Sequence, residues 1–140
     1  MHYVDTSVIV AALTIEEHTV AAQAWLNNRS SSEILISDWV VTEFSSAMSL
    51  KLRTRQIDME GRASAQSLFK RFLSENLSLV TVMPGQFRTA ALFADHHDLG
   101  LRAGDALHLA IASEYGATLC SLDRRLVEAG PALGVPTVTP

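Results

Sequence analysis

Aspartates recur in this chain where a buried strand is predicted to give way to a helix. Asp5 follows an apolar run that ends at Val4 and precedes a packed helical run at residues 8–13. Asp105 opens a helical run, and Asp123 follows the apolar run at residues 117–122. In open α/β sheets, ligands bind just outside the carboxyl ends of the strands. The pattern therefore predicts an α/β fold with a polar site at one edge of the sheet.

Predicted strands and helices alternate along the rest of the chain. The further strands are expected at residues 34–36, 77–82, 117–122 and 135–138. Helices are expected at residues 17–28, 39–53 and 59–75, from Pro84 onwards, and at residues 106–114 and 124–129. Alternation of this kind is typical of a central, mostly parallel sheet between two layers of helices. With 140 residues and no linker or repeat, we expect one three-layer α/β/α domain over residues 1–140.

Composition narrows the class of protein. No apolar stretch approaches the length of a membrane-spanning helix, and the amino terminus lacks the pattern of an export signal. We therefore expect a cytoplasmic protein without membrane association. Cys120 is the only cysteine and lies in an apolar run, which excludes an intramolecular disulfide and indicates a packing role.

The acidic residues have two interpretations. Asp5, Asp105 and Asp123 each suit a helix N-cap, which is the commonest reason for an aspartate at such a boundary. Glu43 differs, because helical spacing places it on one stripe with Val40, Ala47 and Leu50.

An unpaired carboxylate directed inward is costly, and a cation shared with other carboxylates would relieve that cost. A surface glutamate at the edge of the stripe is the alternative. Together Asp5, Glu43, Asp105 and Asp123 would form an oxygen-rich site suited to magnesium or manganese. If they converge, their mutual repulsion should raise their pKa values when no metal is bound.

The formal net charge of −4 argues at first against a nucleic-acid partner. If four carboxylates bind cations, however, the other 11 acidic residues balance the 11 basic ones. Whether the protein can bind nucleic acid then depends on local clusters of basic residues. Two such clusters are Lys70-Arg71 and Arg124-Arg125. Solvated helix faces are the simpler interpretation of each cluster, although guanidinium groups also suit phosphate contacts.

Four short motifs resemble, in order and spacing, the acidic motifs of PIN-domain ribonucleases, and most of all the small VapC-type toxins of toxin-antitoxin pairs. They are Val4-Asp5-Thr6-Ser7, Ser37 followed by Thr42-Glu43-Phe44, residues 104–110, and Ser121-Leu122-Asp123. The resemblance implies that Asp5, Glu43, Asp105 and Asp123 are the metal-binding and catalytic quartet. It also implies that Ser7 and Ser121 support the site, where the family often has threonine in place of Ser121.

The same resemblance implies a PIN-like fold and an activity. We expect Mg²⁺-dependent or Mn²⁺-dependent hydrolysis of RNA phosphodiesters, with water as nucleophile and with 5′-phosphate and 3′-hydroxyl ends on the products. An antitoxin protein is the implied partner. A homodimer is also expected, because the domain is small, its early helices are rich in apolar residues, and related toxins usually pair.

Other chemistries fit the residues less well. A phosphoacceptor module needs a lysine at a late strand end, a haloacid-dehalogenase-like phosphatase needs an aspartate at the position of Ser7, and P-loop and dinucleotide fingerprints are absent from the sequence. His96-His97 suits a hydrated helix end better than a metal site, and His108 suits a packed or supporting role better than catalysis. Two rival functions remain: a PIN-like RNA-binding or interaction domain without nuclease activity, and a solitary RNA-processing nuclease.

Overall fold

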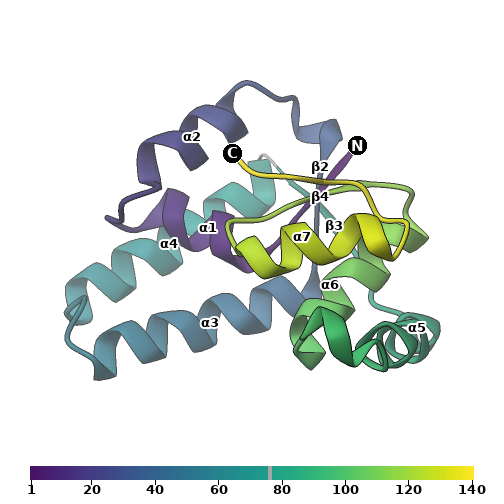
Figure 1. The fold of residues 1–140 in the computed structure, drawn as a ribbon. Coiled ribbons are helices and arrows are strands. Elements are labelled where there is room, and N and C mark those ends of the chain that lie inside the picture. The colour runs from purple at the N-terminus through teal and green to yellow at the C-terminus, as the bar shows by residue number, and fades with distance from the viewer. Residues whose placement is uncertain (76) are drawn as a thin grey trace.

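A single five-stranded parallel sheet forms the centre of the molecule (Figure 1). The computed structural model describes residues 1–75 and 77–140. The strands are β1 (His2–Val4), β2 (Ile34–Ser37), β3 (Ser78–Val80), β4 (Thr118–Cys120) and β5 (Thr137–Val138), in the spatial order β3-β2-β1-β4-β5. The α/β prediction is confirmed, and every strand pairing in the sheet is parallel.

Helices cover both faces of this sheet, as the alternation of elements predicted. They are α1 (Thr6–Leu13), α2 (Thr19–Asn27), α3 (Asp38–Arg53), α4 (Met59–Glu75), α5 (Pro84–Ala94), α6 (Ala103–Glu114) and α7 (Arg124–Ala132). Helices α1 to α4 lie on one side of the sheet and α5 to α7 on the other (Figure 1). Within the described part of the chain, none of these helices is long and apolar enough to cross a bilayer.

The order of the strands creates a switch point between β1 and β4. From β1 the chain moves outward to β2 and β3, and then returns to place β4 on the other side of β1. Val4 pairs with Cys120 in that register, and the Asp5 N–H donates to the Cys120 carbonyl over 3.1 Å. Ligands in open α/β sheets bind where the strand order reverses in this way. Asp5 therefore lies at the position in the sheet best suited to a site.

Several predicted boundaries move once the chain is folded. Helix α6 begins at Ala103 with Arg102 as its N-cap residue, so Asp105 lies inside its first turn instead of opening it. Strand β4 ends at Cys120, and the segment that follows turns towards α1, where the Leu122 N–H donates to Ser7 Oγ over 2.9 Å. The short helices at Ser31–Glu33 and His97–Leu99 were not predicted.

The predicted inner stripe of α3 is correct only in part: Val40 is buried and Ala47 packs against the core, but Leu50 does not. Val40, Phe44 and Met48 are buried at a spacing of four residues, and the Phe44 ring lies 4.2 Å from that of Phe69. Leu50, which was expected on the buried stripe with Glu43, is 50% exposed. Glu43 thus lies beside the core, and its half-buried side chain faces the edge of the sheet where Asp5 lies.

Cys120 packs in the core beside Val4, as its apolar context predicted. Burial raises the pKa of its thiol to about 12, so the side chain is uncharged at neutral pH. A buried thiol of this kind is chemically inert.

Two glycine substitutions test the packing of α7 against β5. A Cβ on Gly130 would lie 2.2 Å from Thr137 Cγ2 and 2.9 Å from the Val135 carbonyl, whereas one on Gly85 would meet only Arg88 Nη2, at 3.9 Å. We expect Gly130→Ala to lower the free energy of unfolding by about 1–3 kcal/mol. Gly85→Ala should raise it by about 0.5 kcal/mol, because alanine restricts the unfolded chain. Urea titrations followed by circular dichroism measure both, and equal effects would contradict the described contact.

Candidate active site

All four predicted carboxylates line one cavity at the carboxyl edge of the sheet. Its volume is about 520 Å³. The other lining side chains come from α1, α3 and the start of α6, and they are Thr6, Ser7, Ser46, Ala47, Leu50, Arg102 and His108. Residues up to 118 positions apart, from Asp5 to Asp123, are brought together there. The structure thus assembles the predicted quartet around a single space.

Asp5 is both a helix cap and a buried acid. Its Oδ1 accepts hydrogen bonds from the Ser7 N–H (3.0 Å), from Ser7 Oγ (2.5 Å) and from the Val8 N–H (3.4 Å). Its Oδ2 accepts from Ser121 Oγ over 2.6 Å, and the residue is only 4% exposed. The capping and cavity-lining interpretations are therefore both met by the same carboxylate.

Ser7 and Ser121, the two serines predicted to support the site, both contact Asp5. Each hydroxyl donates to the carboxylate and accepts a backbone N–H in return. Ser7 Oγ accepts from Leu122 and Ser121 Oγ from Asp123, both over 2.9 Å. The two serines thus hold the segment that leads into α7 against the start of α1.

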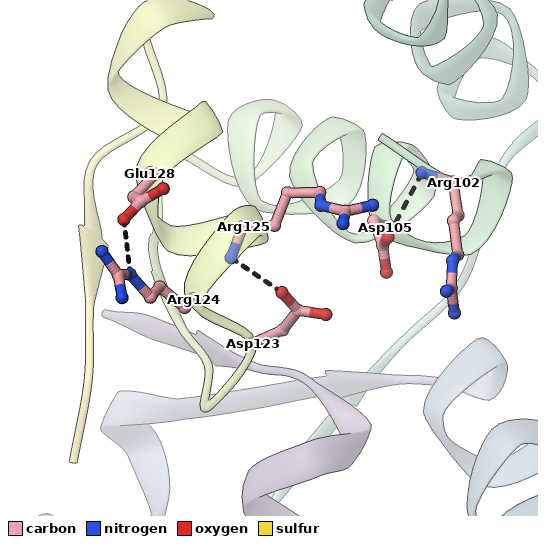
Figure 2. Close-up of a pocket in the computed structure, with 6 residues that line it drawn as sticks. All are labelled: Arg102, Asp105, Asp123, Arg124, Arg125 and Glu128. Atoms are coloured by element: carbon pink, nitrogen blue, oxygen red, sulfur yellow. Dashed lines mark hydrogen bonds and ion pairs between the residues drawn. The ribbon is translucent and has the colours of Figure 1, made fainter. Parts of the chain in front are cut away.

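The other two aspartates face each other across the cavity from different helices. Asp123 is the N-cap of α7, and its Oδ1 accepts from the N–H groups of Arg125 (2.9 Å) and Leu126 (3.2 Å). Asp105 is the third residue of α6 and accepts from the Arg102 N–H over 3.2 Å. Figure 2 shows both carboxylates extending into the space between the starts of the two helices. Asp105 is consequently not an N-cap, and the simpler interpretation fails for it.

Glu43 is held by two donors on one of its oxygens. Oε2 lies 2.5 Å from Thr6 Oγ1 and 2.7 Å from His108 Nε2. The opposite wall is backbone, because a Cβ on Gly104 would lie 3.0 Å from Glu43 Oε1. Glycine at this position of α6 therefore lets the helix approach the carboxylate closely.

The local environment shifts the pKa values of these acids in opposite directions. Burial raises the pKa of Asp5, against the lowering effects of His108, Ser121 and Ser7. Burial also raises the pKa of Asp105, and the nearby charge of Asp123 adds to that effect. The expected mutual repulsion thus contributes at Asp105 but is secondary to burial.

Glu43 departs from the expectation of raised pKa values. Burial alone would raise its pKa, but the hydrogen bond and charge of His108, together with the Thr6 hydroxyl, lower it overall. Glu43 is therefore ionised at neutral pH, and its environment favours the charged form.

The carboxylates that line the cavity are suited to binding a hard divalent cation. Carboxylate oxygens are the ligands that Mg²⁺ and Mn²⁺ prefer, and four of them line this cavity. As the side chains stand, no three His, Cys, Asp or Glu residues among residues 1–75 and 77–140 are gathered closely enough to hold an ion. Asp5, Glu43, Asp105 and Asp123 are the side chains that would hold an ion here, and its charge would offset the repulsion between Asp105 and Asp123.

Arginines line an adjoining cavity of about 440 Å³, which shares Arg102, Asp105 and Asp123 with the first. Arg125 crosses from α7 to the loop before α6, where its Nη1 donates to the Gly100 carbonyl over 3.2 Å. Arg124 turns away and pairs with Glu128 over 2.8 Å (Figure 2). Arg102 thus stands between the two cavities, with its side chain beside that of Asp105.

Comparison with known proteins identifies the family. The pattern that defines the PIN domain matches residues 2–130. The chain belongs to the PIN-domain family. Ribonuclease VapC35 of Mycobacterium tuberculosis is 30% identical over 145 aligned positions, which cover all of this chain and 97% of the relative. The predicted resemblance to PIN-domain proteins of the VapC type is thereby confirmed.

Solved structures of VapC20 and VapBC2 share the fold. VapC20 of Mycobacterium tuberculosis, a toxin that cleaves the sarcin-ricin loop, superposes with a TM-score of 0.74 at 19% identity, and the match covers both chains fully. VapBC2 from Rickettsia felis, bound to a DNA fragment from its promoter, gives a TM-score of 0.70 at 17% identity over 99% of this chain and 98% of that one. Both likenesses concern the fold alone.

Several residues around the PIN-domain site were not predicted as site residues. Thr6 contacts Glu43 directly, although its only signal in the sequence is its position next to Asp5. His108 was assigned a packed or supporting role, and it is buried against Glu43. Arg102 was given no role, because a lone arginine before a helix carries no pattern of its own.

Asp105→Asn should change stability and metal binding in opposite directions. The folded pKa of Asp105 is raised, so its effect on stability is most favourable in acid and declines as the pH rises from the unfolded value, about 3.9, through the folded one. Asparagine removes this charge and keeps an oxygen for the Arg102 N–H. At neutral pH in chelator, the variant should therefore melt at a higher temperature than the parent.

Saturating cation tests the other half of this prediction. At about a hundredfold its dissociation constant, an ion should add about 2.7 kcal/mol to the unfolding free energy of the parent, and clearly less to that of Asp105→Asn. Melting curves with and without Mn²⁺ measure the difference. A variant that melts lower in chelator and keeps the full response to metal would remove Asp105 from the quartet.

Proposed function

We propose that this protein is a divalent-metal-dependent endoribonuclease and the toxin of a toxin-antitoxin pair. One observation carries the proposal: four acidic side chains line a single cavity at the switch point of a PIN domain. The 30% identity to a ribonuclease over the full chain supports the choice of RNA as substrate. The acid set is the same one that the sequence motifs predicted.

Asp5, Glu43, Asp105 and Asp123 would hold the metal. Bound Mg²⁺ or Mn²⁺ would activate a water molecule and offset the charge that grows on the phosphate oxygens. Ser7 and Ser121 keep Asp5 in place through the hydrogen bonds described above. Thr6 and His108 do the same for Glu43, whose lowered pKa keeps it ionised and able to bind a cation. In this mechanism the carboxylates bind ions and do not act as bases.

The arginines beside the cavity suit an RNA backbone. Once cations neutralise Asp105 and Asp123, the charges that remain in the adjoining cavity are those of Arg102, Arg124, Arg125 and Glu128, with a net positive balance. Guanidinium groups bind phosphate oxygens through paired hydrogen bonds. The adjoining cavity would thus position a phosphate next to the cleavage site.

An antitoxin partner is part of the proposal. Among the structures that share this fold are VapBC2 from Rickettsia felis and VapBC from Salmonella typhimurium, both solved bound to DNA. The favoured alternative is a PIN domain that binds RNA or a protein without cleaving. A solitary processing nuclease is the other, and a short neighbouring gene for a DNA-binding protein would argue against it.

We expect purified RNA to be cut only in the presence of Mg²⁺ or Mn²⁺, with 5′-phosphate ends on the products. End labelling and treatment with phosphatase identify those ends. Glu43→Gln keeps the size of the side chain and an acceptor for Thr6, yet loses the charge. It should slow cleavage by more than about 100-fold, since loss of a ligand exceeds the usual effect of losing a supporting contact.

Parent and Glu43→Gln are purified in parallel, so that contaminating nucleases appear equally in both. Cyclic phosphate ends, or full activity in excess chelator, would contradict metal catalysis and indicate histidine or 2′-hydroxyl chemistry. Cation binding without cleavage of any RNA would favour the silent binding domain.

We also propose a homodimer, and the exposed apolar residues of α5 supply its test. Phe87 is 54% exposed and Leu92 66% exposed, and Phe87 borders an apolar groove with Trp39 and Leu107. Light scattering at micromolar concentration should give the mass of two chains for the parent and of one chain for Phe87→Arg. Ile15→Arg, at a fully exposed apolar position outside α5, is the matched control and should stay dimeric. A monomeric parent would contradict the proposed homodimer.

A further inference from the structure

A buried chain of polar side chains runs from the sheet to Glu43. Ser37 Oγ lies 2.7 Å from the Tyr3 hydroxyl, and this hydroxyl lies 3.0 Å from His108 Nδ1. On the other side of the ring, His108 Nε2 lies 2.7 Å from Glu43 Oε2. Ser37 and Tyr3 are fully buried, and His108 is 2% exposed. Three polar groups in the core are thus satisfied by one another and by Glu43.

The chain is built from the same elements that carry the acids of the candidate site. Tyr3 lies on β1, two residues before Asp5, which follows the strand as the N-cap of α1. His108 lies one helical turn after Asp105 on α6. Ser37 ends β2, at the start of the helix that carries Glu43. Each connection therefore relates one acid-bearing element to the next.

Ser37 hydrogen-bonds to Tyr3 instead of capping α3. It occupies the N-cap position of α3, where a serine hydroxyl ordinarily accepts from the first turn of the helix. Among the described residues, no such capping hydrogen bond from its side chain is present. Its hydroxyl contacts Tyr3 instead. The hydrogen bond to Tyr3 therefore takes precedence over helix capping.

Protonation of the ring does not break the chain. The ionised carboxylate of Glu43 can only accept, so His108 Nε2 carries a hydrogen and donates. In the neutral ring, Nδ1 accepts from Tyr3, which accepts from Ser37; in the charged ring, both bonds reverse. Either way His108 has a partner on each nitrogen, and its orientation is fixed.

We propose that Tyr3 and His108 are positioning residues that hold Glu43 in the orientation needed to bind a divalent cation. Thr6 and His108 donate to the same oxygen, Oε2, from α1 and α6, so the carboxylate is held between two helices. Tyr3 acts only through His108, because it contacts the ring and not the carboxylate. The inference rests on the proposed function, since it presupposes that Glu43 binds metal.

Mn²⁺ affinity separates this role from simple core packing. Tyr3→Phe removes one hydroxyl and keeps the ring, and Tyr3 is not one of the cavity-lining residues. Loss of a group that orients a ligand typically weakens metal binding 10-fold to 100-fold. Calorimetric titration with MnCl₂ should therefore give a dissociation constant about 10-fold higher for Tyr3→Phe.

Tyr115→Phe is the matched control, because it removes the other tyrosine hydroxyl, which donates to the Thr81 carbonyl far from the cavity. Its Mn²⁺ affinity should equal that of the parent. Ser37→Ala, at the far end of the chain, provides a second variant should Tyr3→Phe fail to fold, and it should weaken Mn²⁺ binding in the same direction. Circular dichroism in chelator checks that each variant is folded.

A double-mutant comparison locates the effect at Glu43. In a Glu43→Gln background, Tyr3→Phe should no longer change Mn²⁺ affinity, because the group it positions is gone. An equal affinity of parent and Tyr3→Phe, or an effect of Tyr3→Phe that persists with Glu43→Gln, overturns the positioning role and leaves the proposed function intact. Absence of Mn²⁺ binding by the parent overturns both.

Discussion

The buried carboxylate of Asp5 is the constraint on which the rest of the site depends. Burying an ionisable acid is costly unless hydrogen bonds compensate for the lost water. Here Ser7 and Val8 compensate from α1, and Ser121 compensates from the segment after β4. The bond from Ser121 spans 116 positions of sequence and forms only when β4 lies beside β1. Asp5 therefore has all of its hydrogen-bond partners only when the sheet is assembled.

The hydrogen-bond network continues outward from Asp5. The serine hydroxyls that donate to it accept backbone N–H groups of Leu122 and Asp123, which fixes the start of α7. Glu43 is held in a parallel way by Thr6 and His108, the latter backed by Tyr3. Buried polar networks that are fully satisfied are rigid, so these contacts fix the positions of Asp5 and Glu43 at the edge of the sheet.

Sequence patterns anticipated that the four acids lie at one edge of the sheet, but not the residues that surround them. Capping and cavity lining were weighed as alternatives, yet Asp5 and Asp123 do both, because a carboxylate has two oxygens and about four acceptor positions. The predicted stripe of α3 included Val40 and Ala47, which do pack in the core, but it missed the buried Phe44 and Met48. Neighbouring stripes on a helix differ by one position, and only the location of the partner helices decides which of them is buried.

The sequence by itself determined the α/β class and the order of the strands along the chain, because periodicity and strand-to-helix boundaries are local properties. The four acids were named through the resemblance of short motifs to those of the PIN family. The tertiary structure decided the placement of β4 beside β1 and the chain from Ser37 through Tyr3 to His108. It also determined the direction of two pKa shifts: burial raises the pKa of Asp5, and His108 lowers that of Glu43. These features depend on contacts of a few ångströms between residues as far apart as 105 and 116 positions, and no local pattern encodes such distances.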